Sequence, residues 1–220
     1  MNRTDKIFAS SLKRGEIGEE IFLSSFAGMK AVKNVYDARY SAKYQDMDID
    51  FIIDLKQRNE PSGLAELAGS TRVFIELKTD YTTHPNLYYE KYSCYELQTA
   101  GCMEKTKSDV LIYYYIKKNV FYVLKTDPFR DWVHAHSEEF RKNFRQELGR
   151  AGIYHKGGLL VPTSMIEAAF EAKEIIGEKV RVGNTFSKKR VEMLDASSYA
   201  KIEILHDERK VKNIFDDMDI

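Results

Sequence analysis

Residues 72–78 read Arg72-Val73-Phe74-Ile75-Glu76-Leu77-Lys78, an apolar run that contains one acid and ends on one base. β-Branched and aromatic residues cluster in it, and turn-rich segments bound it, which favours a short buried strand. Side chains two positions apart in a strand point to the same face. Glu76 and Lys78 are therefore expected to project together, with Ile75 and Leu77 on the opposite side.

A second apolar run lies upstream and reads Asp48-Ile49-Asp50-Phe51-Ile52-Ile53. It predicts a strand over residues 48–54, and a strand paired beside residues 72–78 brings Asp50 to Glu76 and Lys78. Two carboxylates and one ammonium group at one point suit a hard cation and a phosphate. Asp48 shares the expected face and is either a second acid or a solvated strand start. Asp50 is preferred because apolar residues follow it directly.

The order of Asp50 and then Glu76-x-Lys78 resembles the active-site signature of the PD-(D/E)xK nuclease superfamily, which has the restriction-endonuclease-like fold. The stretch Gly15-Glu16-Ile17-Gly18-Glu19 is similar to the GxxGE-type first helix of many members. In that helix we expect one apolar side, made by Ile17, Ile21, Phe22 and Phe26. The resemblance covers roughly residues 12–126, and Ile49 stands where the signature has proline.

This resemblance implies an α/β fold with a restriction-endonuclease-like core, a mixed central sheet flanked by helices. It also implies hydrolysis of phosphodiester bonds in nucleic acid with Mg²⁺, for which Mn²⁺ can substitute. Asp50, Glu76, the Leu77 carbonyl and Glu19 would hold the metal, and Lys78 would orient the attacking water. DNA is favoured over RNA as the substrate, and a homodimer is left open.

The segment after residue 78 has a weaker likeness to a phage-type subgroup of these nucleases. There a strand that carries a glutamate precedes a small-residue turn and an x-x-Ala-Asp entry into the next strand. Glu90, Gly101 and Ser108-Asp109 match this order, with Ser108 in place of the alanine. Glu90 is therefore an accessory residue of the expected site or a solvent-facing strand residue.

Composition restricts the classes of protein. The 220 residues are 43% hydrophobic and 31% charged, which is typical of a globular protein. The formal net charge of zero argues against a general coat for nucleic acid, although a local basic surface suffices for an enzyme. We expect no membrane partner, because neither a long apolar stretch nor a signal-peptide pattern occurs. Cys94 and Cys102 have no zinc spacing and are expected to be free thiols in a reducing cytoplasm.

The remaining pattern gives the order of elements. The central sheet is expected to contain strands at residues 48–54, 72–78, 86–93, 109–116 and 119–126, between helices at residues 13–28 and 128–149. A short strand at 32–36, a last core strand at 157–162 and a helix at 163–176 complete the elements. Residues 1–176 are predicted to form the nuclease-like domain, and residues 177–220 to form a C-terminal extension with a basic cluster at 186–191.

Two other classes of protein stay open. One is a nucleic-acid-binding module with the same fold and no cleavage. The other is an α/β interaction protein in which the acids form structural salt bridges. Intact Asp50, Glu76 and Lys78 favour the enzyme over the inactive module.

Overall fold

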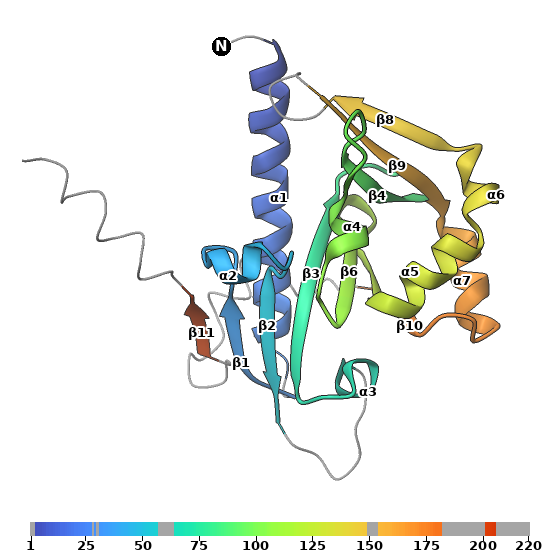
Figure 1. Cartoon of the computed structure of the whole chain (residues 1–220). Coiled ribbons are helices and arrows are strands. Elements are labelled where there is room, and N and C mark those ends of the chain that lie inside the picture. The colour runs from blue at the N-terminus through green and yellow to red at the C-terminus, as the bar shows by residue number, and fades with distance from the viewer. Residues whose placement is uncertain are drawn as a thin grey trace, which may run out of the picture.

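The computed structural model describes residues 3–27, 29, 31–56, 64–148, 154–181 and 201–205. The fold is α/β, with a mixed central sheet of seven strands and helices on both sides (Figure 1). In spatial order the strands are β10 (Gly177–Arg181), β7 (Val120–Lys125), β6 (Val110–Tyr115), β3 (Arg72–Asp80), β2 (Phe51–Leu55), β1 (Val32–Asp37) and β11 (Lys201–Ile204). β3 pairs in parallel with β6 and β1 with β11, and the other neighbours are antiparallel.

A second sheet has four strands, all antiparallel, and lies at the upper right in Figure 1. Its order is β5 (Thr99–Ala100), β4 (Asn86–Cys94), β9 (His155–Pro162) and β8 (Phe144–Leu148). The expectation that residues 86–93 belong to the central sheet is therefore wrong. Alternation of side chains along a segment predicts a strand, but it does not determine which strand becomes its neighbour.

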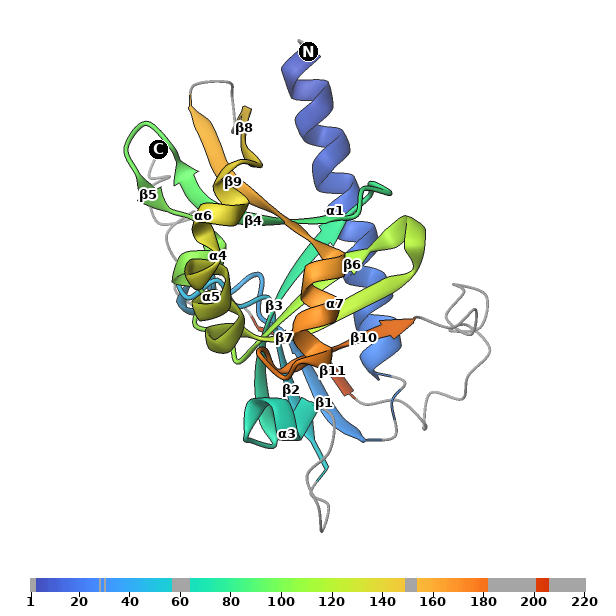
Figure 2. The same ribbon diagram turned by 90° about the vertical axis from the view of Figure 1, so that its right-hand side faces the viewer.

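The helices α1 (Arg3–Ala27), α5 (Thr126–Ala135) and α7 (Thr163–Glu171) cover the central sheet. From α1, Phe22 and Phe26 pack on one face against Phe51 of β2 and Phe121 of β7. The helices α5 and α7 pack on the other face, as Figure 2 shows. The shorter helices are α2 (Ala42–Gln45), α3 (Leu64–Ala68), α4 (Cys102–Lys105), η1 (Ile116–Lys118) and α6 (Ser137–Arg141).

The first helix is longer than the predicted range of 13–28, because it begins at Arg3. No glycine or proline interrupts residues 3–14, so nothing in the sequence stops the helix there. Ile17 is 36% exposed and does not join the buried side made by Phe22 and Phe26. The sheet does not extend under the N-terminal half of this helix, as Figure 1 shows.

The predicted long helix at 128–149 is also wrong. The chain forms α5, then the short α6, and then strand β8, which pairs with β9. Phe144 and Leu148 are four residues apart, so they satisfy the helical spacing although they lie in a strand. Pairing with a distant segment has overridden the local pattern.

The other boundaries differ by smaller amounts. The strand expected at 48–54 begins at Phe51, and the helix expected at 163–176 ends at Glu171. The hairpin at 109–126 and the short strand at 32–36 are confirmed as β6, β7 and β1. From the segment after residue 176, β10 and β11 form the two edges of the central sheet. The basic cluster at 186–191 lies outside the described residues.

Candidate active site on strand β3

Strand β3 places Glu76 and Lys78 on one face of the central sheet. Val73, Ile75 and Leu77 alternate with them and are buried in the core beneath α1. The Glu76 side chain is nearly inaccessible, at 3% exposure, whereas the Lys78 side chain is 35% exposed. The Lys78 Nζ lies 2.6 Å from Glu76 Oε1. The two side chains thus form an ion pair in which the carboxylate is buried and the lysine is partly exposed to solvent.

Asp50 lies directly before β2, beside β3. Its backbone N–H donates to the carbonyl of Ile75 at 2.9 Å, and its Oδ2 accepts from the Leu77 N–H at 2.9 Å. These two bonds fix the carboxylate of Asp50 next to the Glu76–Lys78 pair. The Leu77 backbone thus contributes an N–H contact to the site.

Asp48 does not share a strand face with Asp50, contrary to the expectation. It lies in the turn that follows α2, with a φ of 48°, and its Oδ2 is 3.0 Å from Lys105 Nζ. Aspartate tolerates this left-handed conformation better than most residues. The turn nevertheless returns Asp48 to the wall of the same cavity.

A cavity of about 350 Å³ connects these side chains. Its polar and charged lining includes Glu19, Arg39, Asp48, Asp50, Glu76 and Lys78. The structure therefore brings together every acid that the sequence singles out except Glu90. The lining comes from α1, the segment after β1, the entry to β2 and strand β3.

Glu19 reaches this cavity from α1 and is ion-paired with Arg39. Arg39 also binds Asp37 through Nε at 2.8 Å and Nη2 at 2.5 Å. α1 can approach the sheet closely because Gly18 faces Thr79, where a Cβ on residue 18 would lie 2.3 Å from Thr79 Cγ2. Glycine at position 18 thus positions Glu19 at the site.

The electrostatic surroundings of Glu76 and Lys78 differ from those of surface residues. Burial raises the pKa of Glu76 to about 8, with a further contribution from the charge of Asp50, although Lys78 opposes the increase. Burial disfavours the charged form of Lys78, but the neighbouring acidic groups Cys102, Glu76 and Asp50 outweigh it and raise the lysine pKa. The site therefore combines a charged Lys78 with a Glu76 carboxyl group whose pKa is about 8.

Glu90 lies on β4 of the second sheet, near enough to Lys78 for the lysine charge to act on it. It accepts from Lys156 Nζ at 2.9 Å and from the Cys102 N–H at 3.4 Å. Burial opposes its ionisation, but the charges of Lys156 and Lys78 lower its pKa. Glu90 is therefore an ion-pair partner of Lys156 near the site, with a side chain that is 14% exposed, and it does not line the cavity beside Asp50.

The donor atoms of this site fit a hard cation. Asp50 and Glu76 present carboxylate oxygens to one cavity, and a cation there would stabilise the ionised form of Glu76 against its burial. Within the described ranges, no three His, Cys, Asp or Glu side chains converge into a metal-binding group. Mg²⁺ is commonly held by only one or two carboxylates together with water and substrate phosphates, so two acids meet its requirement.

Sequence reasoning missed Arg39, Asp37 and Lys156. Asp37 ends β1, and Arg39 follows two residues later in a turn with no recognisable motif. Lys156 reaches Glu90 from a strand 66 positions away along the chain. Only the pairing of β4 with β9 brings these two residues together, and no local signal encodes that pairing.

No family model, curated protein or solved structure matches the chain. None of the helices in the described part of the chain has both the length and the apolar character needed to cross a membrane. Both cysteines, Cys94 and Cys102, are free thiols.

Proposed function

We propose that the chain is a metal-dependent nuclease that hydrolyses phosphodiester bonds, with DNA favoured over RNA. The observation that carries this proposal is the buried Glu76, paired with Lys78 at 2.6 Å, in one cavity with Asp50. A buried carboxylate with a raised pKa and a specific charged partner is typical of a functional site. A structural ion pair alone would gain little from such burial, because desolvation offsets the attraction.

Each side chain has a chemical role in this proposal. Asp50 and Glu76 would hold Mg²⁺, and Asp48, which lines the same cavity, would accept a hydrogen bond from a bound water. When bound, Mg²⁺ supplies a water of lowered pKa and polarises the phosphate. Lys78 would leave Glu76 and donate to a phosphate oxygen, where its charge stabilises the negative charge that develops during hydrolysis.

The ion pair of Arg39 with Asp37 and Glu19 forms one wall of the cavity. Arg39 is held by two carboxylates, so its guanidinium is oriented and cannot move freely toward a phosphate. We assign it the role of positioning Glu19 beside the expected metal. Glu90 and Lys156 would act from the other side, by fixing the surroundings of Lys78.

A substrate panel tests the proposal. Single-stranded, duplex and branched DNA, with matched RNA, are incubated with the protein in Mg²⁺, Mn²⁺ or chelator. The proposal expects cleavage of at least one substrate with either metal and none in chelator. Tight binding of a substrate with no cleavage under any condition would favour the inactive binding module, and neither binding nor cleavage would favour the interaction protein.

A further inference from the structure

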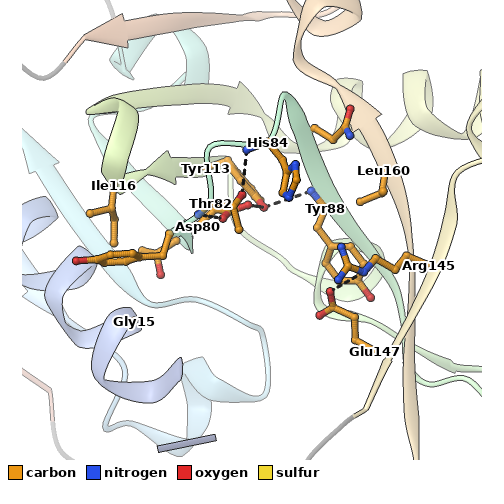
Figure 3. Close-up of a pocket in the computed structure, with 13 residues that line it drawn as sticks. Gly15, Asp80, Thr82, His84, Tyr88, Tyr113, Ile116, Arg145, Glu147 and Leu160 are labelled. Atoms are coloured by element: carbon orange, nitrogen blue, oxygen red, sulfur yellow. Dashed lines mark hydrogen bonds and ion pairs between the residues drawn. The ribbon is translucent and has the colours of Figure 1, made fainter. Parts of the chain in front are cut away.

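A second cavity, of about 490 Å³, opens where β3 ends (Figure 3). Thr79 and Asp80 line it, so it begins one residue beyond Lys78 on the same strand. A strand rises about 3.3 Å per residue, which places Asp80 about 6.6 Å along the strand from Lys78. The cavity therefore adjoins the strand segment that carries the proposed catalytic lysine, and its volume is in the range of small-molecule sites.

Gly15 of α1 lines this cavity, and packing does not explain its identity. A Cβ built on Gly15 meets no atom within 4 Å, whereas a Cβ on Gly18 would collide with Thr79. Glycine inside a helix costs roughly 0.5–1 kcal/mol relative to alanine, so it is retained where something must approach the backbone. At Gly18 the group that approaches the backbone is Thr79 of β3. At Gly15 no protein atom does so, and the open cavity there has room for a ligand.

The charges of the lining do not suit a phosphate inside the cavity. Asp80 accepts from the Tyr113 hydroxyl at 3.1 Å, and Glu147 Oε1 lies 3.1 Å from Arg145 Nε. Among the described lining residues, two carboxylates, Asp80 and Glu147, thus outnumber the one guanidinium of Arg145, so these charges would repel an entering anion. A neutral group that carries both hydrogen-bond donors and acceptors would complement the lining instead.

Aromatic and polar groups of β4 indicate a planar ligand. Tyr88 lines the cavity, and its phenol oxygen is buried without a hydrogen-bond partner in the part of the chain that the structure describes. Burying an unpaired hydroxyl is unfavourable, and a ligand atom at this point would relieve the cost. Asn86, two positions earlier on the strand, adds an amide to the lining.

Cations lie at one edge of this cavity, where Lys118 Nζ bonds the carbonyl of His84 at 2.9 Å. The Lys117 ammonium lies 5.7 Å from the centre of the Tyr81 ring. Both lysines follow β6 in the turn η1, outside the acidic interior. A phosphate next to a bound base would therefore meet positive charge at this edge.

We propose that this second cavity binds one nucleobase of the substrate, beside the phosphate held at Glu76 and Lys78. The inference rests on the proposed function and extends it by naming the group that is recognised. A base has the flat apolar faces, the edge donors and acceptors and the neutral charge that the lining accommodates.

Nucleotide binding without metal tests this inference on the full chain. The four deoxynucleoside 5′-monophosphates and 2-deoxyribose 5-phosphate are titrated by calorimetry into wild type and three variants. Gly15→Leu and Leu160→Trp fill the cavity from α1 and from β9. Glu20→Leu places the same leucine on an exposed position of α1 outside the cavity and is the matched control. Melting temperatures establish that each variant is folded.

At least one nucleotide should bind at least tenfold more tightly than deoxyribose phosphate. Both filling variants should weaken that binding at least tenfold, and Glu20→Leu should change it less than twofold. Equal or absent binding of nucleotide and sugar phosphate, or undiminished binding by both filling variants, would overturn the inference. The nuclease proposal fails separately if the protein binds a nucleotide in this assay but cleaves no substrate in Mg²⁺ or Mn²⁺.

Discussion

Replacing Glu76 by glutamine should stabilise the protein at alkaline pH and leave it almost unchanged at acidic pH. Burial raises the pKa of Glu76 from 4.5 to about 8 in the folded state. Between these values the folded protein binds more protons at Glu76 than the unfolded chain does, so its stability falls as the pH rises. Glutamine does not titrate, and the variant loses this dependence.

The expected size follows from the two pKa values. One pKa unit corresponds to about 1.4 kcal/mol, so the full interval is worth at most roughly 5 kcal/mol. The pKa of about 8 already includes the attraction to Lys78, and the range from pH 5 to pH 8.5 samples only part of the full effect. We expect the free energy of unfolding of Glu76→Gln, relative to wild type, to be about 2–4 kcal/mol higher at pH 8.5 than at pH 5.

Urea unfolding of both proteins at several values between pH 5 and pH 8.5 measures this difference. Glu138→Gln is the matched control, because the Glu138 side chain is 79% exposed on α6, where it pairs with Arg141. The control should follow the wild-type curve within about 0.5 kcal/mol. Parallel curves for wild type and Glu76→Gln across this range would show that Glu76 is not held protonated by burial.

Three further outcomes are expected. Gly15→Ala should raise the melting temperature, because open space surrounds the new methyl group, and Gly18→Ala should lower it through a clash with β3; calorimetric scans that show the same sign for both would contradict this. Mg²⁺ should raise the melting temperature more at pH 8 than at pH 6, because its binding requires ionised Glu76; an equal shift at both values would argue against this ligand. Asp50→Asn should reduce the initial rate of cleavage far more than Asp48→Asn, since Asp48 is paired with Lys105. Equal losses in the two variants would mean that Asp50 is wrongly assigned as the metal ligand in preference to Asp48.

The central part of the fold could be predicted because its signals are local. The run at 72–78 contains the alternation of a strand, and the hairpin at 109–126 contains its own turn between two apolar runs, and both form as expected. The strand β8 could not be predicted, because Phe144 and Leu148 fit a helical period and only β9 makes them a strand. The same dependence on distant partners separated β4 from the central sheet.

The candidate site shows the same division. Strand alternation was enough to place Glu76 beside Lys78, and adjacency of β2 and β3 then brought Asp50 to them. Arg39 escaped prediction because it lies in a turn, and its partners come from two other elements. The raised pKa of Glu76 also depends on burial by surrounding elements, which a sequence pattern does not give.

Cleavage by Lys78→Ala, compared with wild type, tests the central claim most directly. The measurement is the single-turnover rate on the best substrate of the panel in Mg²⁺, with Lys142→Ala, an exposed lysine after α6, as the control. We predict a loss of at least 100-fold for Lys78→Ala, which corresponds to about 2.7 kcal/mol of transition-state stabilisation, and less than a twofold change for Lys142→Ala. Wild-type rates in a folded Lys78→Ala variant would contradict the assignment of this site as the nuclease centre.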